Sequence, residues 1–145
     1  MDWLLALQGS GFAQTLRAST WAYPTVATLH AVGASLAVGA VVLMDLRLLG
    51  FGSALDRAAV LRFALPVALT GAALALVAGL AMFSTGAAHY ARNPAFLFKM
   101  GALVFALWNA VAFHRLAAAS GRLNAVASLV AWLGVVAGGI FTAYF

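Results

Sequence analysis

Residues 23–50, YPTVATLHAVGASLAVGAVVLMDLRLLG, form an apolar stretch with ionisable side chains near both ends. About 20 consecutive apolar residues cross the hydrocarbon core of a bilayer, so the stretch predicts a transmembrane helix over residues 23–45. His30 follows Pro24, a suitable first helical residue, by six positions, which is roughly 9 Å along the axis and inside the hydrocarbon. Because ionisable residues inside a membrane span indicate function, His30 and Asp45 are candidate site residues.

A second stretch, residues 93–114, NPAFLFKMGALVFALWNAVAFH, repeats this arrangement. Asn93 is a typical N-cap and Pro94 a typical first helical residue, so they predict the start of a helix. Lys99 follows Pro94 by five residues, and His114 follows Lys99 by fifteen, the same spacing as that from His30 to Asp45. Fifteen residues advance a helix by about 22 Å and turn it by a net 60° or so, so each span carries two polar groups on one broad face.

If the two spans run in the same direction, these side chains form two polar layers. His30 and Lys99 would lie near the end where the spans begin. Asp45 and His114, with Asn109, would lie near the opposite end.

The composition indicates an integral membrane protein. Of the 145 residues, 66% are hydrophobic and 8% charged, and the mean hydropathy is +1.05, which leaves too little polar surface to coat a soluble domain. No linker divides the chain, so we expect one all-α domain, an integral membrane four-helix bundle. Its predicted spans cover residues 23–45, 65–89, 94–114 and 124–145.

Two further segments are expected to lie at the membrane surface. Residues 1–20 interleave apolar and polar side chains and predict an amphipathic interfacial helix interrupted around Gly9–Gly11, with a loosely ordered lead-in as the alternative. Between the first two spans, Ser53 followed by Asp56 resembles a capping box and predicts a short interfacial helix leading to Pro66.

The net charge of +5 reflects membrane topology rather than nucleic-acid binding, because the basic residues lie at span ends and in short loops. Five arginines follow spans one and three, whereas two lie on the opposite side. The positive-inside rule therefore predicts a multi-pass protein of the bacterial inner membrane with both termini in the periplasm. The five are Arg47, Arg57, Arg62, Arg115 and Arg122; the two are Arg17 and Arg92.

The polar residues allow several chemistries. His30 could ligate a metal or haem, carry protons, or be a hydrogen-bonded core histidine. His89 is a candidate second axial or metal ligand, or else an interfacial loop residue. Lys99 could bind an anionic group such as a haem propionate or extend to the headgroups, and it is a catalytic candidate together with Asp45 and His114.

No cysteine and no hydrolase, kinase or dinucleotide motif is present, and three acidic residues are too few for a carboxylate dyad or a hard-cation cage. Four helices around buried histidines suit a haem. Glycines in the last span, including Gly134 and Gly138, form a small-residue face that could mediate homo-oligomerisation.

The segments TLHAVGASLAVGAVVLMDLRLLG and NPAFLFKMGALVFALWNAVAFH resemble an uncharacterised bacterial family of small four-span membrane proteins. More distantly, the histidine early in span one and the lysine early in span three resemble those of J-type membrane protoporphyrinogen oxidases and CopD-type copper-resistance membrane proteins. The resemblance to the J-type oxidases implies bound haem b and a functional pair, here His30 and Lys99. The chain departs from them by lacking a tryptophan after His30 and by having DLRLLG at the inner end of the span.

The leading hypothesis is a b-type haem protein that handles electrons between a quinone or porphyrin-like donor and an acceptor. His30 would be an axial ligand, and Lys99 would bind a propionate. The alternatives are a transporter or channel for protons or for a soft metal such as copper, and a non-catalytic membrane anchor subunit. The four methionines are too scattered to suggest a copper pathway.

Overall fold

The computed structural model describes residues 2–116 and 121–145, and within these the side chains of all residues except 113–116. Every regular element in these ranges is an α-helix, which confirms the predicted all-α class. The helices are α1 (Asp2–Gln8), α2 (Gly11–Ala18), α3 (Ala22–Leu49), α4 (Arg57–Thr85), α5 (Ala87–Tyr90), α6 (Pro94–Leu116) and α7 (Gly121–Phe141).

Four of these helices, α3, α4, α6 and α7, are long and apolar enough to cross a membrane. They carry large apolar side chains on their outer surfaces, including Phe63 (73% exposed) and Val104 (65% exposed). Such exposure is unfavourable in water and favourable in lipid, where the solvent is as apolar as the side chain. The protein is therefore a multi-pass α-helical membrane protein.

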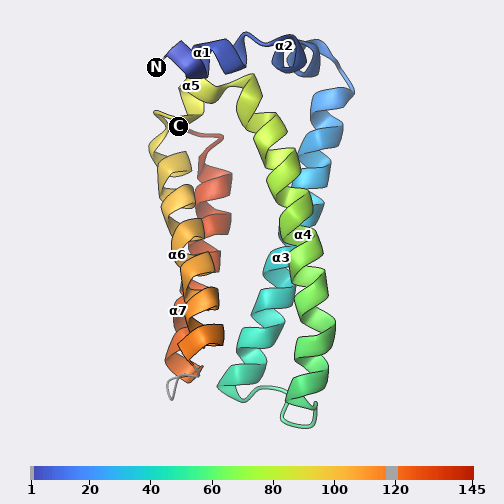
Figure 1. The fold of residues 1–145 in the computed structure, drawn as a ribbon, viewed down its shortest axis with the longest axis vertical. Coiled ribbons are helices and arrows are strands. Elements are labelled where there is room, and N and C mark those ends of the chain that lie inside the picture. Colours follow the sequence, from blue (N-terminus) through green and yellow to red (C-terminus); the bar gives the residue numbers. More distant parts are fainter. Residues whose placement is uncertain (1, 117–120) are drawn as a thin grey trace.

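The four long helices form two hairpins, α3 with α4 and α6 with α7 (Figure 1). The hairpins meet through contacts between α3 and α7. Helices α3 and α6 run in the same direction, as the two-layer arrangement requires. We call the end that holds α1, α2, α5 and both termini the terminal end, and the end that holds the α3–α4 connection the loop end.

Small residues let the helices approach closely. One core cluster joins α3 to α4 through Ala40, Ala64 and Ala68, and a second joins α6 to α7 through Ala106, Ala131, Trp132 and Val135, with Val38 and Val41 of α3 packed against it. The tightest crossing is between Gly33 and Gly71, because a Cβ on Gly33 would lie 2.7 Å from the Gly71 carbonyl oxygen. Packing of this kind drives helix association in lipid, where burial of apolar surface gives no advantage.

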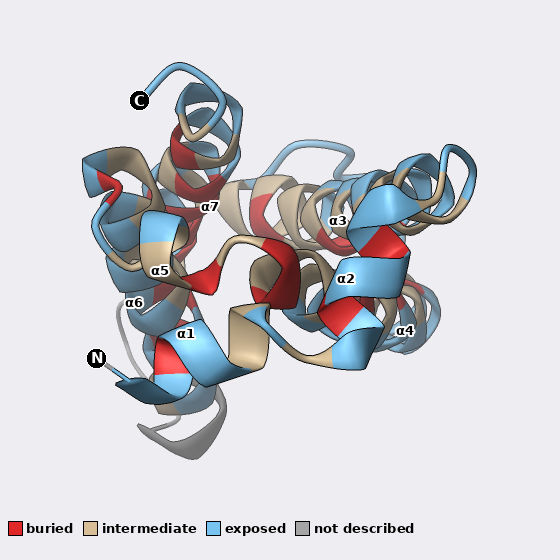
Figure 2. Ribbon diagram, turned by 90° about the horizontal axis from the view of Figure 1, so that it is seen from above, coloured by how far each residue is buried: buried red, intermediate tan, exposed pale blue. Residues whose placement is uncertain are grey.

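The N-terminal segment is a broken helix, as its sequence predicts. Ser10 ends the break by accepting a hydrogen bond from the Ala13 backbone N–H, which caps α2. Seen from the terminal end, α1 and α2 lie across the bundle (Figure 2), in contact with α3, α4 and α5. Leu4 and Leu16 are buried in this packing. Trp3 stays 67% exposed, so the segment has one face for the bundle and one for the membrane interface.

The connection between α3 and α4 differs from its prediction. Helix α3 continues to Leu49 and ends in a Schellman motif, in which Gly50 has φ 106° and the Phe51 N–H donates to the Leu46 carbonyl (3.0 Å). The N-cap of α4 is Asp56, not Ser53: its carboxylate accepts from the Ala59 N–H at 2.7 Å.

Helix α4 then continues through Pro66 as one element, where a separate short helix and a span beginning at residue 65 were expected. Proline inside a membrane helix is tolerated because neighbouring groups satisfy the freed backbone. At its other end α4 stops at Thr85, and His89 belongs to the separate short helix α5.

Candidate functional site

His30 occupies the face of α3 that is shared between its two neighbours. Because successive residues are about 100° apart, His30, Ala37 and Val41 lie within roughly 40° of one another on the helix. Ala37 lies at the contact with Gly71 of α4, and Val41 packs against the α6–α7 cluster. His30 is half-buried and lies about 12 Å from the start of α3 at Ala22, which is within the membrane span.

The imidazole of His30 is held by α4. Its Nδ1 lies 2.7 Å from the carbonyl oxygen of Ala75. A carbonyl only accepts hydrogen bonds, so Nδ1 carries a proton, and in the neutral imidazole Nε2 is then the nitrogen with a free lone pair. Gly79, one turn along α4, gives the ring its space, because a Cβ there would lie 3.0 Å from the Cε1 atom of His30.

This arrangement has a chemical consequence. Histidines that ligate metals commonly donate their second ring N–H to a carbonyl, which fixes the tautomer and the ring orientation. His30 already has that tautomer and partner, and no described residue bonds its Nε2. His30 therefore fits the role of an axial ligand to haem iron.

Lys99 lies on α6 against the glycines of α7. A Cβ on Gly138 would lie 3.0 Å from the Cβ of Lys99, and a Cβ on Gly139 would lie 3.7 Å from its Nζ. The aliphatic stem of Lys99 therefore fills the space that these glycines leave, and the side chain is half-buried. Within the described residues, the ammonium group has no anionic partner, so it fits a role in binding an acidic ligand or a headgroup.

His89 lies apart from His30. It is exposed on α5, and its described contact is with the ring of Tyr90, at a centroid distance of 5.7 Å. Among the described residues no hydrogen bond or ring contact joins His89 or Lys99 to His30. Of the two histidines, only His30 has a described partner for its Nδ1, and ligation by His89 stays a prediction.

An aromatic cluster closes the terminal end. Tyr90 of α5 stacks near Phe83 of α4 and Phe96 of α6, with centroid distances of 6.1 and 5.5 Å. Burial, reinforced by a hydrogen bond with Tyr23 of α3, raises the pKa of Tyr90 to about 12. The cluster ties three spans together on the same side as His30.

Two residues of the predicted second polar layer, Asp45 and Asn109, have described surroundings toward the loop end. Asp45 is only 6% exposed, and its carboxylate interacts with the hydroxyl of Ser128 on α7. Asn109 of α6, also buried, donates from Nδ2 to the Asn124 carbonyl oxygen on α7 at 3.1 Å. His114 belongs to the backbone of α6, but its side chain lies outside the described part of the chain.

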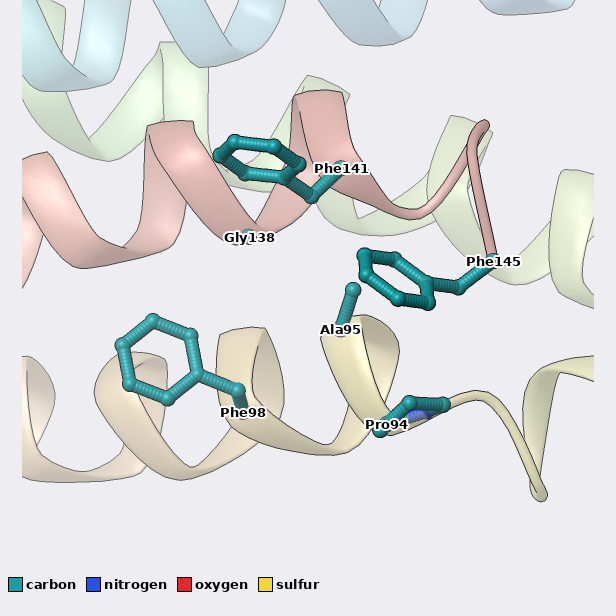
Figure 3. Close-up of a pocket in the computed structure, with 6 residues that line it drawn as sticks. All are labelled: Pro94, Ala95, Phe98, Gly138, Phe141 and Phe145. Carbon is teal, nitrogen blue, oxygen red and sulfur yellow. The ribbon is translucent and has the colours of Figure 1, made fainter.

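A pocket of about 420 Å³ lies on the α6–α7 hairpin close to the terminal end (Figure 3). Its lining is apolar and dominated by phenylalanine rings, and neither His30 nor His89 contributes to it. The lining residues are Pro94, Ala95, Phe98, Gly138, Phe141 and Phe145. Because it lacks a polar lining atom, it supplies no ligand for a metal.

Within the described residues, no group of three or more histidine, cysteine or acidic side chains could hold a metal ion. One-ligand attachment of haem through His30 does not need such a group.

Some site residues were missed by sequence reasoning. Ser128 looks like an ordinary small residue in an apolar helix, and its meeting with Asp45 depends on how α7 packs on α3. Ala75 contributes only a backbone carbonyl, which no side-chain pattern reveals. Ala75 does belong to a pattern that is visible in the sequence: Gly71, Ala75 and Gly79 are small residues at every fourth position, which predicts a close helix crossing.

The glycines of the last span pack against α6 of the same chain. A Cβ on Gly134 would lie 3.5 Å from the Cβ of Ala102, and a Cβ on Gly138 would lie 3.1 Å from the Cδ1 of Phe98. The predicted small-residue face is thus a real helix contact, made within one chain. Homo-oligomerisation through it stays a prediction.

Comparison with known proteins gives no relative: no family model, no curated protein and no solved structure matches the chain.

Proposed function

We propose that this protein is a b-type haem-binding membrane protein that transfers electrons between a quinone or porphyrin-like donor and an acceptor. The observation that carries the proposal is the geometry of His30, whose Nδ1 donates to the Ala75 carbonyl while Nε2 keeps a free lone pair inside the membrane. Haem would supply the one-electron chemistry, and the burial of its ligand would tune the potential.

Lys99 supports the same proposal from α6. Lys99 lies five residues after the start of α6, as His30 lies near the start of α3, and among the described residues its ammonium group has no anionic partner. A haem propionate carries the charge that would compensate it. In this role Lys99 holds the cofactor, while His30 ligates it.

The test is the absorption spectrum of the protein purified from cells supplied with a haem precursor and titrated with hemin in detergent. We expect a Soret band in the wild type and its loss in His30→Ala. His89→Ala is the companion variant, which should retain the Soret band because His89 is not the ligand that carries the proposal. Retained haem with loss of low-spin character in that variant would identify His89 as a second ligand.

A monodisperse, fully helical wild type that stays colourless after hemin titration would remove the haem proposal. It would favour the alternatives, a proton or soft-metal transporter or a membrane anchor subunit. Circular dichroism and size-exclusion chromatography of each variant establish that the fold is intact, so the loss of colour reports on ligation.

The protein is further proposed to lie in the bacterial inner membrane with the terminal end facing the periplasm. The support is the distribution of arginines, five at the loop end and two at the other, as counted along the sequence. Alkaline phosphatase fused after Phe145 should be active, and the same reporter inserted at Gly52 should be inactive. The reverse pattern would invert the membrane orientation and the sides of both polar layers.

A further inference from the structure

Asp45 is a buried acid with an incomplete set of partners. It is 6% exposed, and its Oδ2 atom has no hydrogen-bond partner. Its one described polar contact is the hydroxyl of Ser128. A buried oxygen without a donor is unfavourable, and it is much more so on a charged carboxylate than on a neutral acid.

No compensating charge faces Asp45 in the described part of the chain. On α7 the polar group that contacts Asp45 is the Ser128 hydroxyl, and the buried polar side chain of α6 toward the same end is the neutral amide of Asn109. The α4 residues of the core cluster beside this part of α3 are apolar: Ala64, Ala68 and Val67. Arg47, two residues along α3, donates from Nε to the Leu55 carbonyl at 2.9 Å and makes no ion pair with Asp45.

The position of Asp45 gives it a route to water. It lies four residues before the end of α3 at Leu49, which is roughly 6 Å along the axis. The polar groups of Asn109 and Asn124 meet at the adjoining end of α7. The carboxyl group is therefore buried, but close to one aqueous surface.

We propose that Asp45 and Ser128 form a proton-binding site inside the membrane, at which the Asp45 carboxylate takes up one proton from the aqueous phase at the loop end and releases it there. Before proton release the site holds Asp45 as the neutral acid, because no described cation lies beside it to balance the charge of the carboxylate. Ser128 is a positioning residue: its hydroxyl bonds the carboxyl group and favours the ionised form when the proton leaves. The ligand is the proton itself, and no other reactant takes part.

Infrared spectroscopy tests the site directly, because a protonated carboxyl group has a C=O stretching band that a carboxylate lacks. The chain has only three acidic side chains, Asp2, Asp45 and Asp56, so the band can be assigned. Asp2 and Asp56 are exposed. At neutral pH the protein should show the band, the band should shift in heavy water, and Asp45→Asn should remove it.

The double variant Asp2→Asn/Asp56→Asn is the matched control and keeps Asp45 as the last acidic side chain. It should retain the full band. The double variant also keeps the test decisive if Asp45→Asn does not fold. Apart from the carboxyl group of the chain terminus, Asp45 is the source of any protonated-carboxyl band that the double variant shows. In Ser128→Ala the band should persist to higher pH than in the wild type, because the donor to the carboxylate is gone.

A carbodiimide that reacts with protonated carboxyl groups adds an independent readout. Incubated with membranes containing the protein, it should modify Asp45 and leave Asp2 and Asp56 unmodified, as peptide mass mapping would show, and the yield should fall as the pH rises. A spectrum without the band at neutral pH, or a band that Asp45→Asn leaves unchanged, would overturn the proposal. Neither result depends on haem, so the two proposals fail separately.

Discussion

Replacing Gly33 by alanine should separate α3 from α4. An ideal Cβ at Gly33 would lie 2.6 Å from the Ala75 nitrogen and 2.7 Å from the Gly71 oxygen. Ordinary contact begins at 3.4 Å, so the helices must move apart locally by about 0.8 Å. Because both atoms belong to the backbone, no side chain can rotate out of the way.

The free energy of the change can be estimated from this displacement. A gap of 0.5–1 Å forfeits about a quarter to a half of the dispersion energy of the atom pairs it opens. Overpacking of this kind typically costs about 1–3 kcal/mol. Gly33→Ala should also lengthen the 2.7 Å contact between His30 and Ala75, because His30 lies one turn away on the same helix.

The assay is unfolding in mixed micelles of mild detergent and dodecyl sulfate, followed by tryptophan fluorescence. Gly39→Ala is the matched control: it introduces the same methyl group into the same helix, and nothing lies within 4 Å of that Cβ position. The control should be unchanged or slightly more stable, because alanine is the better helix former.

Gly71→Ala should behave like Gly33→Ala, since its Cβ would lie 2.6 Å from the Ala37 nitrogen. The double variant should be destabilised by less than the sum of the two single variants, because the first separation makes room for the second methyl group. If Gly33→Ala and Gly39→Ala have equal stabilities, the close crossing is not the packing that holds α3 to α4.

Three further changes test other parts of the structure. Asn93→Ala should lower the free energy of unfolding by about 1–3 kcal/mol, because the side chain caps α6 and also donates to the carbonyl of Thr142, directly after α7. The change Ser35→Ala at an exposed site should leave it unaltered; equal unfolding curves for the two variants would refute the double role of Asn93. Lys99→Met should keep the fold but weaken hemin binding about 10- to 100-fold, and Lys99→Arg should not restore the binding fully. Equal hemin occupancy in the wild type and both variants would make Lys99 an interface anchor. The pKa of Tyr90 is about 12 in the fold against the ordinary 10, so the stability that it contributes is full below about pH 10 and is lost as the pH rises toward 12. Thermal unfolding measured across this pH range should show the loss. Tyr90→Phe, which also removes the bond with Tyr23, should make the loss smaller.

Local chemistry allowed much of the fold to be predicted. The apolar lengths predict four spans, Asn93 and Pro94 predict the start of α6, and the glycines around Ser10 predict the break between α1 and α2. These features depend on groups a few residues apart, such as the Phe96 N–H, which donates to the side-chain Oδ1 of Asn93 at 3.1 Å.

The α3–α4 connection shows where local signals compete. Ser53 and Asp56 are both good capping residues, and the sequence offers no reason to prefer one. The Schellman motif at Gly50 and the bond from Arg47 to Leu55 fix the path of the loop, and that path leaves Asp56 as the cap. In the sequence Pro66 indicates a helix boundary. In the structure α4 continues past it, because Ala64 before it and Ala68 after it both pack against α3.

The sequence by itself determined which residues carry polar chemistry in the membrane, and at what depth, because 1.5 Å per residue converts spacing into position. Only the tertiary structure decided their partners. His30 binds a backbone carbonyl and Asp45 meets Ser128, which lies 83 positions further along the chain. The rotation of each helix about its axis sets such pairs, and that rotation depends on how small residues on neighbouring helices fit together.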